Sequence, residues 1–304
     1  MATNPISSTI NAVRKVAVNT FGVDAFTTSG GSGLYNRARP SYPPQAIDKI
    51  LSLLPNGRKA QVIEVGAGTG IFTSNFINHT SANDKIKSLI AIEPSSGMRE
   101  AFNKNEGLLP YLSNNDAQKP NVQVKDGSFG EIPVPDGSVD IIVGAQCFHW
   151  AHPDYQSAIT EFSRVLKPQT GILALIWNLE DRKTAKWVGG IRDLYEKYEN
   201  DTPQYRLGWW KEMFNTQAYK DNFGEPEQFD YHLSHPTTVQ GVVDRVWSKS
   251  YITAQSKEEQ DKIAAGIKEI LSKQDDGGDK KWIDEKEGVF EYPYETNLFI
   301  MKRK

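Results

Sequence analysis

A glycine-rich run is the part of this chain best suited to hold a nucleotide. It covers residues 64–70 (EVGAGTG) and lies between a short apolar segment and a segment of helical character. Glycine allows sharp turns and lets a ligand approach the backbone without interference from a Cβ atom. The free N–H groups of a helix N-terminus would face that ligand. The run predicts a nucleotide-binding turn; its structural alternative is a tight strand-to-helix connection.

The spacing of the glycines distinguishes between two kinds of cofactor. A dinucleotide fingerprint G-x-G-x-x-G beginning at Gly66 needs a glycine at position 71, where this chain has Ile71. The third glycine is instead Gly70, and an acid, Glu64, stands two residues before the first glycine. The pattern therefore disfavours an NAD(P)-dependent oxidoreductase, which remains the second candidate among enzymes.

Polar residues follow three further apolar segments. Glu93 ends the segment SLIAIE, 23 residues after Gly70, where a carboxylate can accept hydrogen bonds from the ribose hydroxyls of an adenosine. Asp126 follows the next apolar segment, and residues 146–150 (QCFHW) follow the one after that. Histidine has the pKa range of a general base. For His149 this role and a packing role that orients the loop both stay open.

The apolar pattern predicts a scaffold that would bring these residues together. Up to residue 177, short apolar segments alternate with segments of helical spacing. We expect strands at 61–65, 88–93, 122–125, 139–144 and 172–177. This alternation predicts a doubly wound parallel sheet of the α/β class. Such a sheet binds ligands at the carboxyl ends of its strands, so the polar residues above would line one crevice.

The alternation of apolar and helical segments ends after residue 177. We expect strands at 227–233, 290–292 and 296–302, and helices at 239–246 and 258–273. An antiparallel edge that closes the same sheet fits this pattern better than a second independent domain.

Composition argues against several classes of function. The 304 residues carry a net charge of −3 and one cysteine, Cys147. The charge gives no sign of a basic surface for nucleic acid or anionic membrane. One cysteine cannot form a disulfide within the chain, and it argues against a cysteine-based metal site. We expect a cytoplasmic monomer or homodimer with a small-molecule substrate, no nucleic acid or membrane partner, and no metal.

The first 23 residues contain no acid and are rich in Ser, Thr and Asn, as in organelle transit peptides. Only Arg14 and Lys15 are basic in this stretch, so the arginine enrichment of transit peptides is missing. A short helix near residues 10–18 is the preferred interpretation.

The motifs, in this order over residues 35–177, resemble class I S-adenosylmethionine-dependent methyltransferases. The resemblance is to the small-molecule branch related to trans-aconitate methyltransferase and the fungal thiol methyltransferases of the gliotoxin type. Residues 35–43, with Tyr35, Arg39-Pro40 and Tyr42-Pro43, also resemble the N-terminal segment of that branch. The resemblance implies a Rossmann-like seven-stranded sheet of order 3-2-1-4-5-7-6. Its last strand would be antiparallel, and residues 296–302 would form it.

The resemblance also implies which residues hold S-adenosylmethionine. They are Tyr35, Arg39, Glu64, Gly66, Ala67, Gly68, Thr69, Gly70, Glu93, Met98, Asp126, Gly127, Ser128, Gln146 and Phe148. Tyr35 and an arginine would lie near the methionine carboxylate, and the choice between Arg37 and Arg39 stays open. Gln146 and His149 are the candidate catalytic residues.

Three regions follow from this interpretation. Residues 1–44 would form an N-terminal helix and a segment that covers the cofactor, and residues 45–177 the Rossmann-like core. Residues 178–304 would form a helical substrate cap and the strands that complete the sheet. Candidate substrate contacts are Trp150, Trp177, Trp209 and Trp210, although aromatic rings of a cap can equally be its core. Arg182 and Arg206 are alternative contacts for a carboxylate substrate.

The predicted reaction is methyl transfer to a small metabolite, in the manner of secondary metabolism. A thiolate is already partly ionised near neutral pH and a carboxylate is fully ionised, so neither needs much help from a base. Because no base is obvious, the sequence favours S-methylation or carboxyl O-methylation. A non-catalytic regulator that binds S-adenosylmethionine is the alternative from a different class.

Overall fold

A computed structural model describes residues 38–112, 116, 118–274 and 278–304. Five parallel strands form the centre of its sheet. They are β1 (Ala60–Val65), β2 (Ile86–Ile92), β3 (Asn121–Lys125), β4 (Ile141–Ala145) and β5 (Ile172–Glu180). The predictions for Tyr35, Arg37 and the N-terminal helix lie outside the described residues.

Two long antiparallel pairings complete the sheet. β8 (Val289–Lys302) pairs antiparallel with β5 on one side and with β6 (Glu227–Thr237) on the other. The strand order is β3-β2-β1-β4-β5-β8-β6, which confirms the predicted Rossmann-like topology with residues 296–302 in the antiparallel strand. A short strand, β7 (Trp282–Asp284), pairs with β8, so the sheet has eight strands instead of seven.

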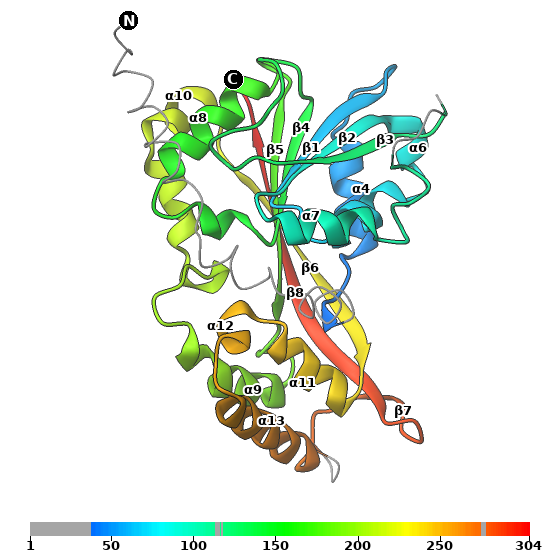
Figure 1. Cartoon of the computed structure of the whole chain (residues 1–304), viewed down its shortest axis with the longest axis vertical. Coiled ribbons are helices and arrows are strands. Elements are labelled where there is room, and N and C mark those ends of the chain that lie inside the picture. Colours follow the sequence, from blue (N-terminus) through cyan, green and yellow to red (C-terminus); the bar gives the residue numbers. More distant parts are fainter. Residues whose placement is uncertain (1–37, 113–115, 117, 275–277) are drawn as a thin grey trace, which may run out of the picture.

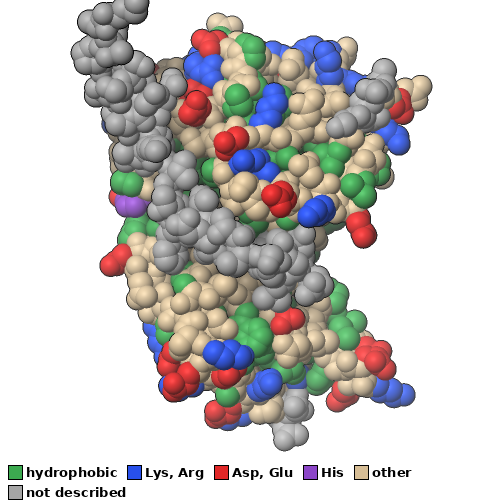
Figure 2. Space-filling view, in the orientation of Figure 1, with side chains coloured by type: hydrophobic (Ala, Val, Ile, Leu, Met, Phe, Trp, Pro, Cys, Tyr) green, Lys and Arg blue, Asp and Glu red, His purple; other side chains and the backbone are tan. Residues whose placement is uncertain are grey.

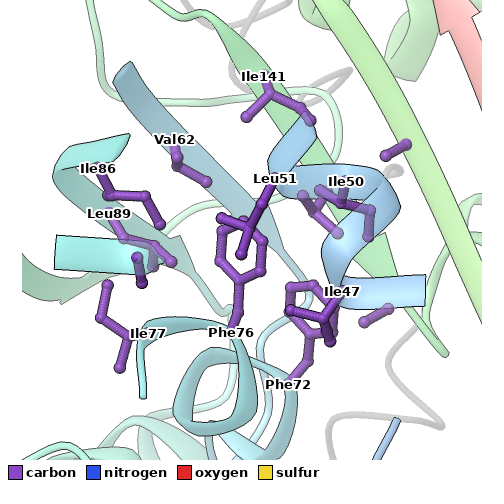
Figure 3. Close-up of a cluster of buried hydrophobic side chains, with 14 of the residues drawn as sticks. Ile47, Ile50, Leu51, Val62, Phe72, Phe76, Ile77, Ile86, Leu89 and Ile141 are labelled. Atoms are coloured by element: carbon purple, nitrogen blue, oxygen red, sulfur yellow. The ribbon is translucent and has the colours of Figure 1, made fainter. Parts of the chain in front are cut away.

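Successive side chains of a strand point to opposite faces of the sheet, and in these strands both faces carry apolar side chains. Helices therefore cover both faces (Figure 1). Val62 packs on one face against α4 (Pro44–Ser52) and α5 (Ile71–Ile77), in the cluster that Figure 3 shows. Its neighbour Ile63 packs on the other face. That face is covered by α8 (Tyr155–Val165), the short helix η5 (Trp209–Asn215) and α10 (Gln217–Asn222). α6 (Ala82–Lys85) and α7 (Ser96–Asn103) lie beside β2 and β3.

The sheet and the helices on its two faces form an upper lobe. One end of β6 and of β8 extends beyond it and supports a lower lobe (Figure 1). Among the described residues its α-helices are α9 (Lys186–Tyr195), α11 (Val239–Trp247), α12 (Ser250–Thr253) and α13 (Lys257–Ser272). Trp187, Val242 and Ile267 from these helices share a third apolar cluster with Tyr292 and Tyr294 of β8. The predicted cap is therefore helical, but its helices pack on an extension of the sheet.

Two element boundaries differ from the sequence-based expectation for local reasons. The pattern after the glycine run predicts a helix over residues 69–78, whereas α5 begins at Ile71 because Gly70 has a φ of +83° and ends the turn. Residues 290–292 and 296–302 were expected as separate strands, yet they belong to one strand through Pro293. The β5 pairing stops at Tyr294, next to Pro293, where a residue without an N–H is tolerated.

Within the described residues, no helix is both long and apolar enough to cross a membrane.

Candidate active site

The glycine run connects β1 to α5 through a backbone that only glycine adopts easily. Gly66, Gly68 and Gly70 have φ values of +63°, +57° and +83°. The N–H of Gly66 donates to the carbonyl oxygen of Ile92 at 2.8 Å, which ties the turn to the end of β2. A Cβ atom at Gly66 would lie 2.6 Å from the Cβ of Cys147, whereas one at Gly68 would meet no described atom within 4 Å. Among the described residues, Gly68 therefore faces open space.

Glu93, the acid at the end of β2, lies against this turn. Its carboxylate accepts hydrogen bonds from the N–H groups of Gly68 and Ser95, both at 2.9 Å. Burial raises the pKa of Glu93, and these two N–H donors oppose the rise. The structure thus brings together the glycine run and the acid that the sequence singled out 23 residues later.

Glu64 has a different place. Its side chain is buried beneath the turn and accepts a hydrogen bond from the hydroxyl of Thr73 in α5. Burial raises its pKa to about 8. In this structure Glu64 fastens the first turn of α5 to β1 from within the core.

A small pocket, here the turn pocket, opens above the glycine run. Its lining consists of Arg39, Pro40, Tyr42, Gly66, Ala67, Gly68, Thr69, Ile71, Phe72, Ala145, Gln146, Asn178 and Arg245. Six of the residues predicted to hold the cofactor are among them: Arg39, Gly66, Ala67, Gly68, Thr69 and Gln146. Gln146 has a φ of +60°, and such strain in a non-glycine residue is typical of functional sites.

A second pocket, here the charged pocket, adjoins the turn pocket where the two lobes meet. Arg39, Gln146, Asn178 and Arg245 line both. The rest of its lining is His149, Trp150, Leu179, Glu180, Tyr195, Glu196, Glu199, Gln204, Tyr205, Arg206, Lys249, Ser250 and Tyr251. The two pockets together form a continuous site at the carboxyl ends of β1, β4 and β5.

Ion pairs dominate the charged pocket. The carboxylate of Glu180 lies 2.8 Å from Nη2 of Arg245 and 3.0 Å from Nζ of Lys249. Burial alone would raise the pKa of Glu180, but these two cations hold it well below its usual range. Burial, followed by the neighbouring Arg245, lowers the pKa of Lys249 to about 7. Across the pocket, Arg206 pairs with Glu199.

Comparison with known proteins gives the family. A sequence family described as a methyltransferase domain matches residues 63–175. An uncharacterized methyltransferase-like protein of Schizosaccharomyces pombe is 32% identical over 237 residues, which are 78% of this chain and 82% of that protein. This chain belongs to the methyltransferases. An uncharacterized methyltransferase of Mycobacterium tuberculosis is 29% identical over 79% of this chain and 83% of its own length.

The solved structure of the YcgJ protein from Bacillus subtilis shares the fold of this methyltransferase. It has a TM-score of 0.50 at 16% identity and covers 86% of this chain and 98% of that one. At this identity the likeness concerns the fold alone.

His149 of this methyltransferase lies in the wall of the charged pocket. Its Nδ1 accepts a hydrogen bond from Nε1–H of Trp177 at 3.2 Å. Burial, with the nearby Arg39, lowers the pKa of His149 to about 3. The ring is therefore neutral near pH 7, and because Nδ1 is an acceptor the proton is on Nε2. In this state His149 offers a hydrogen-bond donor on Nε2.

The four tryptophans predicted to contact substrate lie in different places. Trp150 is half-buried and lines the charged pocket. Trp177 and Trp210 are fully buried, with ring centroids 4.7 Å apart, and neither is in the lining. Trp209 packs against His152, also outside the lining. For these three residues, direct substrate contact stays a prediction, and the structure places two of them in the core behind the pocket.

Other predicted cofactor residues are not in the linings of the two pockets. Phe148 and Met98 are buried, Phe148 in contact with Phe129 and Phe162. Asp126 is exposed and pairs with Arg99. Gly127 and Ser128 follow it in a turn that Ser128 closes by a backbone bond with Glu131, and Gly70 packs against Phe102 of α7. Their contact with a cofactor also stays a prediction.

Sequence reasoning missed most of the charged pocket. Arg206 was named as a carboxylate contact and does line the pocket, whereas Arg182 pairs with Asp193 outside it. Glu180, Arg245 and Lys249 were not singled out. Their one local signal is that Arg245 lies in the last turn of α11 and Lys249 follows it two residues beyond the end of that helix.

Within the described residues, no group of three or more His, Cys, Asp or Glu side chains could hold a metal ion.

Proposed function

We propose that this protein transfers a methyl group from S-adenosylmethionine to a small-molecule acceptor. The observation that carries the proposal is the junction of two pockets, one on a glycine turn and one lined by side chains of both lobes. Arg39, Gln146, Asn178 and Arg245 line both pockets. Two ligands held in such adjoining pockets would meet at this shared wall. Holding two reactants in the right orientation is a main source of rate enhancement in group transfer.

The residues of the turn pocket fit the proposed cofactor. A Cβ atom at Gly68 would enter space that no described atom occupies. Glu93, at the end of β2, provides a carboxylate suited to ribose hydroxyls. Arg39 is a bidentate donor suited to the methionine carboxylate. When bound, S-adenosylmethionine would supply the methyl group in reactive form on its sulfonium sulfur.

The charged pocket supports a small acceptor that carries its own nucleophilic charge, a thiolate or a carboxylate. His149 lines the pocket and is held neutral with its proton on Nε2, so it is suited to orient an acceptor rather than to remove its proton. Gln146 and Asn178 are neutral groups in the shared wall. These side chains would align the nucleophile, while the buried walls exclude water.

A nucleic-acid substrate is less well supported. On the face drawn in Figure 2, acidic and basic side chains are intermixed over both lobes. Net charge is −3 over the whole chain. We propose a cytoplasmic enzyme, monomeric or homodimeric; size-exclusion chromatography and localisation of the tagged protein test these two points.

The experiment combines binding and turnover. Calorimetric titration with S-adenosylhomocysteine and with NAD⁺ should give saturable binding of the former alone. Incubation with methyl-labelled S-adenosylmethionine and a panel of thiols, carboxylates and phenols should then label a thiol or a carboxylate. Binding of NAD⁺ in place of S-adenosylhomocysteine would overturn the proposal. Binding of S-adenosylhomocysteine with no labelled product from any acceptor of the panel would favour a non-catalytic regulator.

A further inference from the structure

Asn178 lies where the two pockets meet, near the carboxyl end of β5. It lines both pockets, yet only 5% of its surface is exposed. A buried amide has two N–H groups and a carbonyl oxygen to satisfy, and leaving them unpaired costs stability. The hydrogen-bond partners of Asn178 therefore show which elements this residue connects.

The side chain of Asn178 connects two segments that are distant from it in sequence. Its Nδ2 donates to the carbonyl oxygen of Ser41 at 2.9 Å, and its Oδ1 accepts from the hydroxyl of Thr296 at 2.6 Å. Thr296 is fully buried in β8 and is the strand partner of Asn178. Because a hydroxyl can donate only to the amide oxygen, Thr296 directs the amide nitrogen toward Ser41.

Ser41 belongs to the segment 39–42, and the other residues of that segment line the turn pocket. Among them is Arg39, the proposed donor to the methionine carboxylate of the cofactor. The hydrogen bond from Asn178 thus ties one wall of the turn pocket to β5. A shift of about 1 Å in such a wall is enough to misalign two reactants.

The main-chain carbonyl of Asn178 fixes another part of the shared wall. It accepts a hydrogen bond from Nε2 of Gln146 at 2.7 Å. The N–H of Gln146 in turn donates to the carbonyl oxygen of Ile176 at 2.9 Å. These two bonds to β5 hold Gln146 at its positive φ of +60°, a conformation that costs energy in a non-glycine residue. One residue of β5 therefore fixes the segment 39–42 and Gln146 relative to each other.

We propose that Asn178 is a positioning residue that sets how cofactor and acceptor face each other at the shared wall. The inference rests on the proposed function and adds a residue to its mechanism. Asn178 acts through Ser41 on the segment that contains Arg39, and through its carbonyl on Gln146, while Thr296 keeps its amide oriented. The effect of Asn178 on cofactor binding therefore depends on Arg39, which would not hold for a residue that serves stability alone.

The test measures S-adenosylhomocysteine binding by calorimetry and the free energy of unfolding, both on the same full-length variants. Asn178→Leu removes both side-chain hydrogen bonds at similar size. Thr296→Val removes only the hydroxyl that orients the amide, whereas Thr296→Ser keeps it. Asn222→Leu is the matched control. Asn222 lies in α10, outside both linings, and its Nδ2 donates to the carbonyl oxygen of Ala218 at 2.8 Å.

We expect Asn178→Leu to weaken S-adenosylhomocysteine binding by about tenfold and Thr296→Val by about threefold, the range of a neutral hydrogen bond. Thr296→Ser should restore most of the affinity that Thr296→Val loses. Asn222→Leu should lose stability but stay within about twofold of the parent affinity.

A double-mutant cycle with Arg39→Met distinguishes positioning from stability. Arg39→Met alone should weaken binding by about tenfold. If Asn178 acts through the segment that contains Arg39, adding Asn178→Leu to this variant should weaken binding by less than about threefold more.

Three results would overturn the inference. These are parent-like affinity in folded Asn178→Leu, an equal loss of affinity in Asn222→Leu, and a further tenfold loss when Asn178→Leu is added to Arg39→Met. If Asn178→Leu does not fold, parent-like affinity in folded Thr296→Val overturns the inference in its place. In each case binding by the parent protein would leave the proposed function standing. Failure of S-adenosylhomocysteine to bind the parent protein would instead contradict the proposed function itself.

Discussion

The two adjoining pockets differ in the groups that line them. The glycine run gives the turn pocket a wall of backbone, where a Cβ atom at Gly68 would meet no described atom and Glu93 accepts a hydrogen bond from an N–H group of the turn. Side chains of both lobes dominate the charged pocket, in which Glu180, Arg245 and Lys249 form a buried ion cluster. A backbone-built pocket is suited to a ligand shared by a whole family. A pocket built from side chains can change its ligand with a few substitutions.

The first prediction separates the walls of the charged pocket from the core behind it. Trp210→Ala should lower the free energy of unfolding by about 3–5 kcal/mol, because a fully buried indole leaves a cavity. Trp150→Ala should cost under about 1 kcal/mol, since Trp150 is half-buried at the pocket. Denaturant unfolding measures both. Equal losses would remove the distinction between core and pocket tryptophans.

The second prediction tests the backbone-built pocket with a matched pair. Gly68 and Gly57 both have positive φ, and a Cβ atom at either would meet no described atom within 4 Å. Alanine at either position should therefore cost a similar ~1 kcal/mol of stability. We expect only Gly68→Ala to weaken S-adenosylhomocysteine binding, by about tenfold, because its methyl group enters the ligand's space. Similar affinities of both variants in calorimetry would mean that the turn holds no ligand.

The third prediction uses pH to probe the charged pocket. The groups around Lys249 are Glu180 from β5, Arg245 from α11, Arg39, Tyr195 from α9, Tyr251 from α12 and Glu199. The pKa of Lys249 is lowered from 10.5 to about 7 in the folded protein, so the unfolded chain binds more protons between these two values. The contribution of Lys249 to the free energy of unfolding should therefore rise with pH above about pH 7, by at most about 1.4 kcal/mol per pH unit. Denaturant unfolding at several pH values measures this rise.

The control for this pH dependence is Lys249→Arg. A guanidinium stays protonated throughout this range, so the free energy of unfolding of the parent protein should rise relative to that of the variant from pH 7 to about pH 9. A pH dependence that is the same in both proteins would assign it to another group.

The smallest effect is expected at His149. Because burial lowers its pKa to about 3, no His149 ionisation should shape kcat/KM between about pH 5 and pH 8. His149→Gln should reduce kcat/KM by less than about tenfold, the range of one neutral hydrogen bond. The measurement is the pH profile of both proteins with any labelled acceptor. Collapse of activity with cofactor binding intact would make His149 a general base and argue against a thiolate or carboxylate acceptor.

The central fold could be predicted from sequence because its signals are local. Short apolar segments separated by helical ones predict parallel strands, and the structure has them in the order that the family resemblance implied. The glycine run and Glu93 could also be predicted, since a turn with positive φ restricts residue type at each position. The short additional strand β7 and the continuity of β8 could not be predicted. β7 has only three residues. Pro293 reads as a break in the sequence pattern, but it lies just beyond the end of the pairing with β5, where a proline is tolerated within a strand.

The sequence by itself determined the sheet, the glycine turn and the class of ligand that such a turn can hold, because these depend on neighbours in the chain. Tertiary structure alone decided which tryptophans became core and which charges share a pocket. Glu180 and Arg245 stand 65 residues apart and meet because β5 reaches the lower lobe and α11 packs on the extension of β6 and β8. Charge and burial at such a site depend on packing between distant segments, which no local pattern encodes.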